Sequence, residues 1–217
     1  MTLTHDPQNS TTLSVLFRDG SKVEHEAAES SSFISELLAG RVNERGYADY
    51  LARLQRVYRA LEDVGRALRN DPLVVDLFDV ALERSAAIAA DIEHWGRGHA
   101  DTAATDAYVA RLDEISRSPI EFIAHHYTRY LGDLSGGRAI GQIVKKTFEL
   151  TDSGAAFYEF VDIPKPKPYK DAYRARLDAL PLTEDEKYAA LAEVKAVFGY
   201  NGAIFAELTA DLDRYRR

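Results

Sequence analysis

Helical spacing of apolar residues is the feature of this 217-residue sequence that most limits what it can fold into. Apolar side chains recur three or four positions apart over most of the chain, most clearly in segment 44–69. This spacing is typical of amphipathic helices. Alternation with a period of two, the mark of a strand, is nearly absent, and β-branched residues rarely cluster. The sequence therefore predicts an all-α fold in a single domain, since the connections are short.

Capping and helix-breaking residues predict where the helices end. Ser30 to Ser32 can cap a short helix that Gly40 ends. Asp71-Pro72 starts a break, and residues 152–168, with three prolines between Pro164 and Pro168, predict the main irregular connection. The other predicted helices cover 12–29, 44–69, 79–95, 102–115, 119–149, 169–179 and 183–212. The chain is predicted to divide into a flexible N-terminus (1–11), one helical domain (12–212) and a charged C-terminal tail (213–217).

Charge and composition limit the partners and the location. The formal net charge of −8 argues against a broad nucleic-acid surface, which needs many Lys and Arg contacts to phosphate. No apolar run approaches the roughly 20 residues of a membrane span, and the polar start lacks the features of a signal peptide. Cysteine is absent, which excludes disulfides and fits a reducing compartment. We expect a cytoplasmic protein with no membrane anchor and no nucleic-acid partner, and a monomer.

Four glycines interrupt a helical pattern at residues 127–146, YTRYLGDLSGGRAIGQIVKK. Each glycine inside a helix costs roughly 1 kcal/mol relative to alanine, so their presence needs a reason. Gly132, Gly136 and Gly137 share one helical side, and the bare backbone there can approach something flat. Close helix packing or a kink is the alternative reason. Asp133 lies beside the bare patch and can act through water, or pair with Arg129.

His25 is a candidate metal ligand on segment 12–29. Glu29 lies one turn later and can hold one ring N–H, which fixes the tautomer and leaves the other nitrogen free for a metal. No second His, Asp or Glu stands at a zinc-like spacing nearby. A single neutral imidazole suits an iron whose other ligands come from a macrocycle. The alternative is a surface histidine in a charged helix. The opposite stripe, expected to face the core, consists of Leu13, Leu16, Val23 and Ala27.

Two pairs of cations stand four residues apart, Arg18 with Lys22 and Lys170 with Arg174. Like charges at this spacing repel by a few tenths of a kcal/mol, which is typical of a solvated face. Taken together with one histidine and a glycine-bared helix, the two pairs suit a flat ligand with two carboxylates. The side chains of Phe198, Asn201 and Phe205 share a helical face and are core residues or a pocket wall.

His125 and His126 form a tempting pair for a shared ligand. Adjacent residues on a helix point about 100° apart, so the two cannot easily bind the same group. We predict structural roles for both.

Several of these segments resemble the heme oxygenase family, in its soluble, bacterial, biliverdin-producing form. YTRYLGDLSGG resembles the family's distal-helix signature, and KVEHEAAE resembles the segment with the proximal heme ligand. FYEFVDIPKPKPYKDAYRARLDALPLTEDE and AVFGYNGAIFAEL resemble its last third. The resemblance covers roughly residues 12–209. It implies that the heme oxygenase domain spans 12–212, with heme sandwiched between a proximal helix and a kinked, glycine-rich distal helix.

The resemblance also implies roles for individual residues. His25 falls on the proximal ligand, with Glu29 beside it, and Asp133 falls on the distal carboxylate that orders waters. Tyr58 and Arg129 match the same hydrogen-bond network. The distal backbone contacts fall on Gly132, Gly136 and Gly137, the propionate-holding positions on Arg18, Lys22, Tyr127, Lys170 and Arg174, and the pocket wall on Phe198, Asn201 and Phe205. The chain departs from the family pattern at Arg18, Arg138 and Gly141 and in the proline-rich turn 164–168.

The activity implied is oxidative opening of heme b, both substrate and cofactor, to biliverdin, with the IXα isomer expected. Ferrous iron and carbon monoxide are released, and O2 is consumed. Electrons must come from a ferredoxin or a flavoprotein reductase, because the chain has no flavin fingerprint and no cysteines for an iron–sulfur cluster. A heme storage or trafficking protein is the main alternative, although it would not need Asp133, Tyr58 and Arg129. A helical enzyme acting on a small cofactor precursor without heme is another.

Overall fold

The computed structural model describes residues 11–217, so the predicted N-terminal segment lies outside the described residues except for Thr11. Within that range the fold is all-α, as predicted, and its one β-bridge joins Val42 to Arg216. The helices are α1 (Leu13–Gly20), α2 (Lys22–Glu29), α3 (Ser32–Leu38), α4 (Glu44–Leu68), α5 (Ser85–Trp95), α6 (Ala103–Glu114), α7 (Pro119–Gly132), α8 (Arg138–Thr147), α9 (Pro166–Asp178), α10 (Glu184–Ala210) and α11 (Leu212–Tyr215), with short segments η1 (Val80–Leu82), η2 (Asp133–Gly137) and η3 (Ala156–Tyr158).

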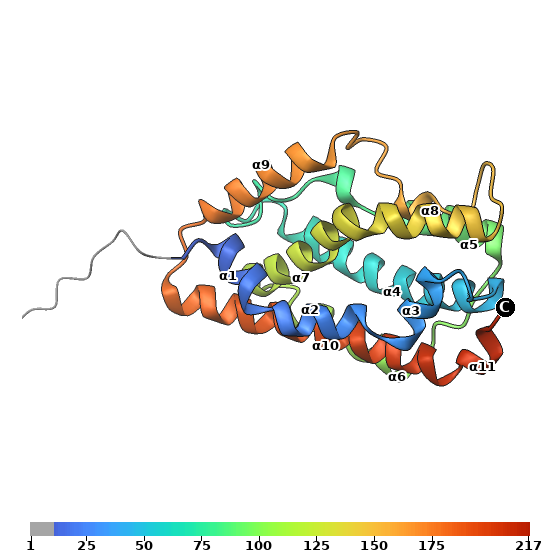
Figure 1. Ribbon diagram of the computed structural model, residues 1–217. Helices are drawn as coiled ribbons and strands as arrows, with labels where there is room; N and C mark the ends of the chain where they lie inside the picture. The colour runs from blue at the N-terminus through green and yellow to red at the C-terminus, as the bar shows by residue number, and fades with distance from the viewer. Residues whose placement is uncertain (1–10) are drawn as a thin grey trace, which may run out of the picture.

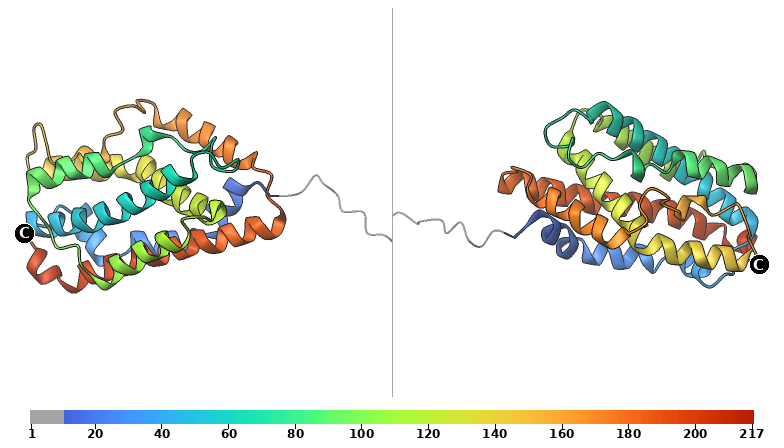
Figure 2. Two further views of the ribbon diagram at one scale, coloured as in Figure 1. Left: turned by 180° about the vertical axis from the view of Figure 1, so that it is seen from behind. Right: turned by 90° about the horizontal axis from the view of Figure 1, so that it is seen from above.

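The two longest helices, α4 and α10, carry the packing of the domain. Figure 1 shows α2 beside α10, with α7 and α8 running above them, and the view from behind in Figure 2 shows α6 beside α10. Thr183 caps α10 in a reciprocal capping box with Glu186, and Asn43 caps α4 by accepting from the Gly46 N–H at 3.0 Å. Both helices therefore begin where the sequence predicted. Gly40, with a φ of 68°, follows the end of α3, also as predicted.

Segment 12–29 is two helices rather than one. Ser21 lies between α1 and α2, and its hydroxyl donates to the Phe17 carbonyl at 2.7 Å. A serine hydroxyl bonded to the backbone in this way competes with regular helix. The break changes the phase of α2, so that Val23 is 74% exposed and Ala27 is exposed as well. The predicted core-facing stripe is therefore wrong for these two residues, although Leu13 is buried.

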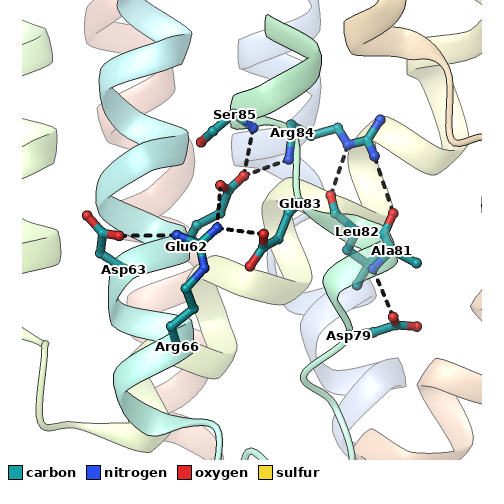
Figure 3. Close-up of polar contacts among 9 residues, drawn as sticks. All are labelled: Glu62, Asp63, Arg66, Asp79, Ala81, Leu82, Glu83, Arg84 and Ser85. Atoms are coloured by element: carbon teal, nitrogen blue, oxygen red, sulfur yellow. Dashed lines mark hydrogen bonds and ion pairs between the residues drawn. The ribbon is translucent and has the colours of Figure 1, made fainter. Parts of the chain in front are cut away.

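Helix α5 begins at Ser85, six residues later than predicted. Asp79 accepts from the Ala81 N–H at 2.9 Å and starts a short 3₁₀ turn instead (Figure 3). The carboxylate of Glu62, on α4, then accepts from the N–H groups of Arg84 and Ser85 at 2.6 and 2.8 Å. A buried acceptor for the first free N–H groups fixes the start of a helix. A partner distant in sequence thus decides this boundary.

The predicted helix 119–149 contains a π-helical segment, η2, between α7 and α8. The Ser135 hydroxyl donates to the Leu131 carbonyl at 2.6 Å within this stretch. Such a segment inside an α-helix is a usual cause of a kink, which agrees with the kinked distal helix implied by the resemblance. Helix α9 starts at Pro166, three residues before the prediction, because proline fits the first turn of a helix, where its missing N–H is not needed.

The predicted charged tail at 213–217 includes residues that pack against the helical domain. Tyr215 is 2% exposed, and its hydroxyl donates to Asp49 of α4 at 2.7 Å. Its carbonyl accepts from the Asn43 N–H at 2.7 Å, and the Arg217 N–H donates to the Arg41 carbonyl. These contacts close the chain end against the start of α4.

Candidate functional site

His25 projects from α2 with an accessible imidazole. Its Nδ1 lies 3.5 Å from a Glu29 carboxylate oxygen, one turn later, as predicted. The ring also meets Phe198 of α10 edge to face, with centroids 5.6 Å apart. A carboxylate on Nδ1 favours the tautomer that leaves Nε2 free to bind a metal. Helix α2 packs against α10 and buries none of its own residues, which leaves this face available.

The glycine-bared surface is present, but it is made of two glycines rather than three. A Cβ added to Gly132 or Gly136 would meet nothing within 4 Å, and both residues are exposed. Gly137 is buried, and its Cβ would touch the Tyr158 ring at 3.4 Å. A Cβ on Gly141 would lie 2.7 Å from the Cβ of Tyr158. The bare-surface interpretation therefore holds for the first pair, whereas Gly137 and Gly141 allow close packing by η3.

Asp133 joins a hydrogen-bond network that spans four helical elements. The Tyr58 hydroxyl, on α4, donates to Asp133 Oδ2 in a short hydrogen bond. Arg129 of α7 donates to the Tyr58 oxygen from Nε at 3.2 Å and from Nη2 at 2.8 Å. The predicted partnership of Asp133 and Arg129 thus runs through Tyr58 and is not a direct ion pair.

Asn201 belongs to this network rather than only to the pocket wall. Its side-chain oxygen accepts from Arg129 Nη1 at 2.6 Å. The other two members of the predicted wall are placed differently: Phe198 meets His25, and Phe205 packs against Tyr50 with centroids 6.2 Å apart. Because α10 carries all three residues, it connects the histidine side of the site with the Asp133 side.

Burial sets the protonation of the network. Burial raises the pKa of Tyr58 well above its usual value, so the phenol keeps the proton that it donates. Burial also raises the pKa of Asp133, against the lowering effects of Arg129 and Tyr58. Although burial lowers it, the pKa of Arg129 is raised overall by Tyr58 and Asp133, and the guanidinium stays charged. Asp133 as a whole is half-buried, and its Oδ2 faces the buried Tyr58 hydroxyl.

A second buried polar cluster, which the sequence did not indicate, joins α4 to the start of α5. Glu62 lies one turn after Tyr58 on α4 and holds the start of α5 (Figure 3). The Arg84 side chain donates to the Leu82 and Ala81 carbonyls, at 3.0 and 3.2 Å, and its guanidinium stacks on Phe160. In the sequence, Glu62 and Arg84 are isolated charged residues, and this pattern does not predict these contacts.

The predicted propionate-holding residues lie on four helices: α1 (Arg18), α2 (Lys22), α7 (Tyr127) and α9 (Lys170, Arg174). Phe17, next to Arg18, packs edge to face on Tyr127 with centroids 5.1 Å apart. Burial raises the pKa of Tyr127, and the positive charges of Arg174 and Arg18 oppose this rise. Lys170 Nζ donates to Ser135 of η2 at 2.9 Å, beside the bare glycines. Lys22 is exposed and faces Glu26 at 3.9 Å. The early start of α9 therefore brings Lys170 to the distal segment.

The two adjacent histidines are buried and point apart, as predicted. His125 Nε2 lies 2.8 Å from a Glu193 oxygen, and His126 Nδ1 lies 2.8 Å from the Tyr173 hydroxyl. Neither faces the open side of η2.

Other features of residues 11–217 lie away from this site. A pocket of about 450 Å³ lies between α4 and α6, and its lining includes Arg59, Ala60 and Val109. In the same range, none of the helices combines the length and the apolar character needed to cross a membrane.

Comparison with known proteins agrees with this geometry. The sequence model of the heme oxygenase family matches residues 11–207. A heme oxygenase of Guillardia theta is 34% identical over 206 residues, which cover 92% of this chain and 87% of that protein. Heme oxygenase-1 from Synechocystis sp. PCC6803, solved in complex with heme, superposes with a TM-score of 0.88 at 31% identity, covering 94% of this chain and 95% of that one.

A heme oxygenase from Leptospira interrogans superposes with a TM-score of 0.86 at 35% identity, covering 91% of this chain and all of the other. A domain of unknown function from Shewanella denitrificans, at 14% identity, shares the fold alone. The family match and these identities extend over nearly the whole chain. The protein belongs to the heme oxygenase family.

Proposed function

We propose that this protein is a heme oxygenase that opens heme b to biliverdin, with release of ferrous iron and carbon monoxide. The observation that carries the proposal is the Asp133–Tyr58–Arg129 network beside a bare glycine surface, in a chain with an accessible histidine on α2. A protein that only stores heme has no need of the network. Relatives that share most of the chain are named heme oxygenases, and one was solved with heme.

The residues present fit a heme on three counts. The backbone at Gly132 and Gly136 is uncovered, since a Cβ at either position would touch nothing within 4 Å, and a flat macrocycle would lie against it. The imidazole of His25 offers one nitrogen for the iron. The cations near Tyr127 and the exposed Lys22 suit two propionate carboxylates.

When bound, heme supplies both the iron that reduces oxygen and the ring carbon that is oxidised. His25 would hold the iron through Nε2, and Glu29, by accepting the Nδ1 proton, would keep the ring in that tautomer. A neutral imidazole donates less electron density than a thiolate would, which suits a reaction that spares the O–O bond at first.

The distal side controls protons. The surface of Gly132 and Gly136 places no acid or base in direct contact with the reacting atoms. Asp133 would instead orient water, its own position fixed by the Tyr58 hydroxyl and, through it, by Arg129. Protons then arrive through ordered water at a rate that the network sets.

The cations determine how heme is seated in its plane. Arg18, Lys22, Lys170 and Arg174 would pair with the propionates, and Tyr127 would donate its phenolic proton to one of them. A fixed rotation presents one meso edge to the distal side, and we propose the α edge, giving biliverdin IXα.

The proposal also covers the electron donor, the oligomeric state and the location. Electrons would come from a ferredoxin or a flavoprotein reductase docking near the cations at the exposed heme edge. We propose that the protein acts as a monomer. A cytoplasmic location remains a prediction from the absence of cysteine.

Mixing the protein with one equivalent of heme and then with ascorbate in air tests the proposal. The expected result is loss of the heme absorption band and growth of a biliverdin band, with a ferrous-iron chelator present to report released iron. Heme that binds and stays intact would indicate storage or trafficking instead. Failure to bind heme would remove the basis of the proposal.

A further inference from the structure

Helix α9 is held to α7 by a buried pair that the proposed chemistry does not use. His126 Nδ1 lies 2.8 Å from the Tyr173 hydroxyl, and the two rings stack 5.7 Å apart at an angle of 9°. His126 is 3% exposed and Tyr173 is fully buried. Phe122 and Tyr130 of α7 pack against the imidazole, with centroids 5.3 and 4.7 Å away. The imidazole therefore packs against three aromatic rings, one of them the ring of Tyr173.

Both partners are neutral in the folded protein. Burial lowers the pKa of His126 to about 3 and raises that of Tyr173 well above its usual value. The contact is an ordinary hydrogen bond between uncharged groups in an apolar environment, where leaving either partner unpaired is costly. It does not depend on pH across the range in which an enzyme works.

Helix α9 has few other anchors. Its buried residues are Tyr173 and Leu177, and it lies at the upper edge of the molecule in Figure 1. Its other polar contacts with the rest of the described chain are exposed or partly buried. Tyr169 donates to Asp79 at 2.8 Å, Lys170 donates to Ser135 at 2.9 Å, and Asp178 accepts from the Ser14 N–H and hydroxyl at 2.7 and 2.9 Å. The His126–Tyr173 bond is thus the anchor of α9 that solvent does not reach.

This anchor lies directly behind the cationic end of the site. Arg174 follows Tyr173 in sequence, and Lys170 precedes it by three residues. On α7, His126 precedes Tyr127. Burial raises the pKa of Tyr127, and the positive charge of Arg174 opposes this rise. On each helix, one residue (His126 or Tyr173) joins the two helices, and the next residue (Tyr127 or Arg174) is one that we propose contacts the propionates. A rotation of α9 by about 20° would move a charged side-chain end, roughly 6 Å from the axis, by about 2 Å.

We propose that the His126–Tyr173 hydrogen bond determines product specificity by fixing the rotation of α9, and with it the positions of Lys170 and Arg174 along the heme edge. The inference rests on the proposed function, because it gives these cations the task of seating the heme propionates. His126 and Tyr173 are positioning residues, since they act through the cations and touch no substrate.

Amide hydrogen exchange of the heme-free protein tests the structural half. Tyr173→Phe and His126→Leu each remove one partner, whereas His126→Asn keeps a polar atom near the place of Nδ1. We expect exchange in residues 166–178 to rise at least tenfold in the first two variants and to stay near the parent rate in the third. Tyr188→Phe, at an exposed tyrosine of α10, is the matched control. Parent-like exchange across α9 in Tyr173→Phe would overturn the inference.

Chromatography of the biliverdin isomers tests the functional half. The parent and Tyr188→Phe should give one dominant isomer, and Tyr173→Phe should raise the minor isomers at least fivefold. His126→Leu tests the same bond from the other side should Tyr173→Phe fail to fold. An unchanged isomer ratio in the folded variants would refute the inference alone, whereas a parent that forms no biliverdin would refute the proposed function.

A further variant tests whether Tyr173 acts through the cations. In a Lys170→Ala, Arg174→Ala background the isomer ratio should already be mixed, and adding Tyr173→Phe should change it less than twofold. A further shift as large as that seen in the parent background would show that Tyr173 acts by another route, and the inference would be wrong.

Discussion

The Tyr58 hydroxyl donates a hydrogen bond to Asp133, and this contact fixes the position of the carboxylate. The phenol keeps its proton because burial raises its pKa, so Asp133 Oδ2 always accepts a hydrogen bond. A group held in this way can orient water without itself approaching the reacting atoms.

Replacing Asp133 by alanine should therefore separate binding from turnover. We expect Asp133→Ala to bind heme with near-parent affinity and to form biliverdin at least about 100-fold more slowly, the usual cost of losing one pre-oriented polar group. Absorption titration and chromatography of products measure the two quantities. Asp152→Ala, at an exposed loop position, is the control. Normal biliverdin yield from Asp133→Ala would remove this residue from the mechanism.

The proposed ligand role of His25 is open to a spectroscopic test. His25→Ala should still bind heme through the cations and the glycine surface, but it should lose the iron–histidine vibration in resonance Raman spectra of the ferrous complex. Glu29→Gln should retain that band, shifted, with heme affinity lowered up to about tenfold. His94→Ala, on α5, should behave as the parent. An unchanged band in His25→Ala would place the ligand elsewhere.

Sequence reasoning at the residue scale succeeded where a side chain acts within its own helix. The partnership of His25 with Glu29 is set by one turn of helix and was predictable. The hydrogen bond from Arg129 to Asn201 joins residues 72 positions apart, and an amide within an aromatic stripe does not reveal its partner. The helical spacing groups Gly137 with the bare surface. The sequence does not show that Tyr158 packs against Gly137, because that contact depends on tertiary structure.

At the scale of elements, η2 carries the distal side of the site on a π-helical segment. Gly136 of η2 and Gly132, the last residue of α7, are exposed, while α8 begins directly after η2 and packs against η3 through Gly141. Gly136 therefore leaves a bare surface, whereas Gly141 allows close packing against η3. Substitution should distinguish these two roles.

Gly136→Ala should leave the heme-free protein as stable as the parent, or up to about 1 kcal/mol more stable, because alanine favours helix and the new methyl group meets nothing. Heme affinity should fall roughly 10- to 100-fold, since overpacking a contact surface typically costs 1–3 kcal/mol. Thermal unfolding and heme titration give the two values.

Two other glycines serve as controls for Gly136→Ala. Gly199→Ala, where a Cβ also meets nothing, should leave heme affinity unchanged. Gly141→Ala should lower the free energy of unfolding by about 1–3 kcal/mol, because its Cβ would lie 2.7 Å from the Cβ of Tyr158. Unaltered heme affinity in Gly136→Ala would show that heme does not lie against this surface.

Helix positions were predictable from spacing and capping, but three boundaries were not. The break at Ser21 comes from a side-chain hydrogen bond to the Phe17 carbonyl, and the delayed start of α5 comes from Glu62, 23 positions before Ser85. Helix α9 starts at Pro166 because proline fits a first helical turn as well as it fits a loop, and the sequence alone does not distinguish the two. Each boundary depends on a choice between two locally acceptable conformations.

At the scale of the whole molecule, buried neutral histidines make stability depend on pH. In the unfolded chain a histidine binds a proton near pH 6.5, whereas His126 in the fold binds one only near pH 3. Protons therefore favour the unfolded state as the pH falls through this interval, and stability is greatest above it. His125 is also held below its usual pKa by burial and acts in the same direction.

The free energy of unfolding should fall as pH is lowered from about 6.5 toward 4, with His126 contributing up to about 1.4 kcal/mol per pH unit. Urea titrations at pH 7, 6, 5 and 4 measure the slope. His126→Asn, which takes up no proton, should show a shallower slope than the parent in the same titrations. Identical slopes for the two proteins would contradict the assignment of this dependence to His126.

Single-turnover oxidation of bound heme tests the central claim most directly. The complex, with one heme per protein, is reduced without oxygen in excess ascorbate, which supplies all the electrons of the reaction. Oxygen is then admitted, and the products are extracted and separated by chromatography, with His25→Ala and Asp133→Ala treated in parallel. The account predicts one biliverdin isomer, released iron and carbon monoxide from the parent, and biliverdin formation at least about 100-fold slower in Asp133→Ala. Heme recovered intact from the parent, or equal biliverdin from all three proteins, would contradict it.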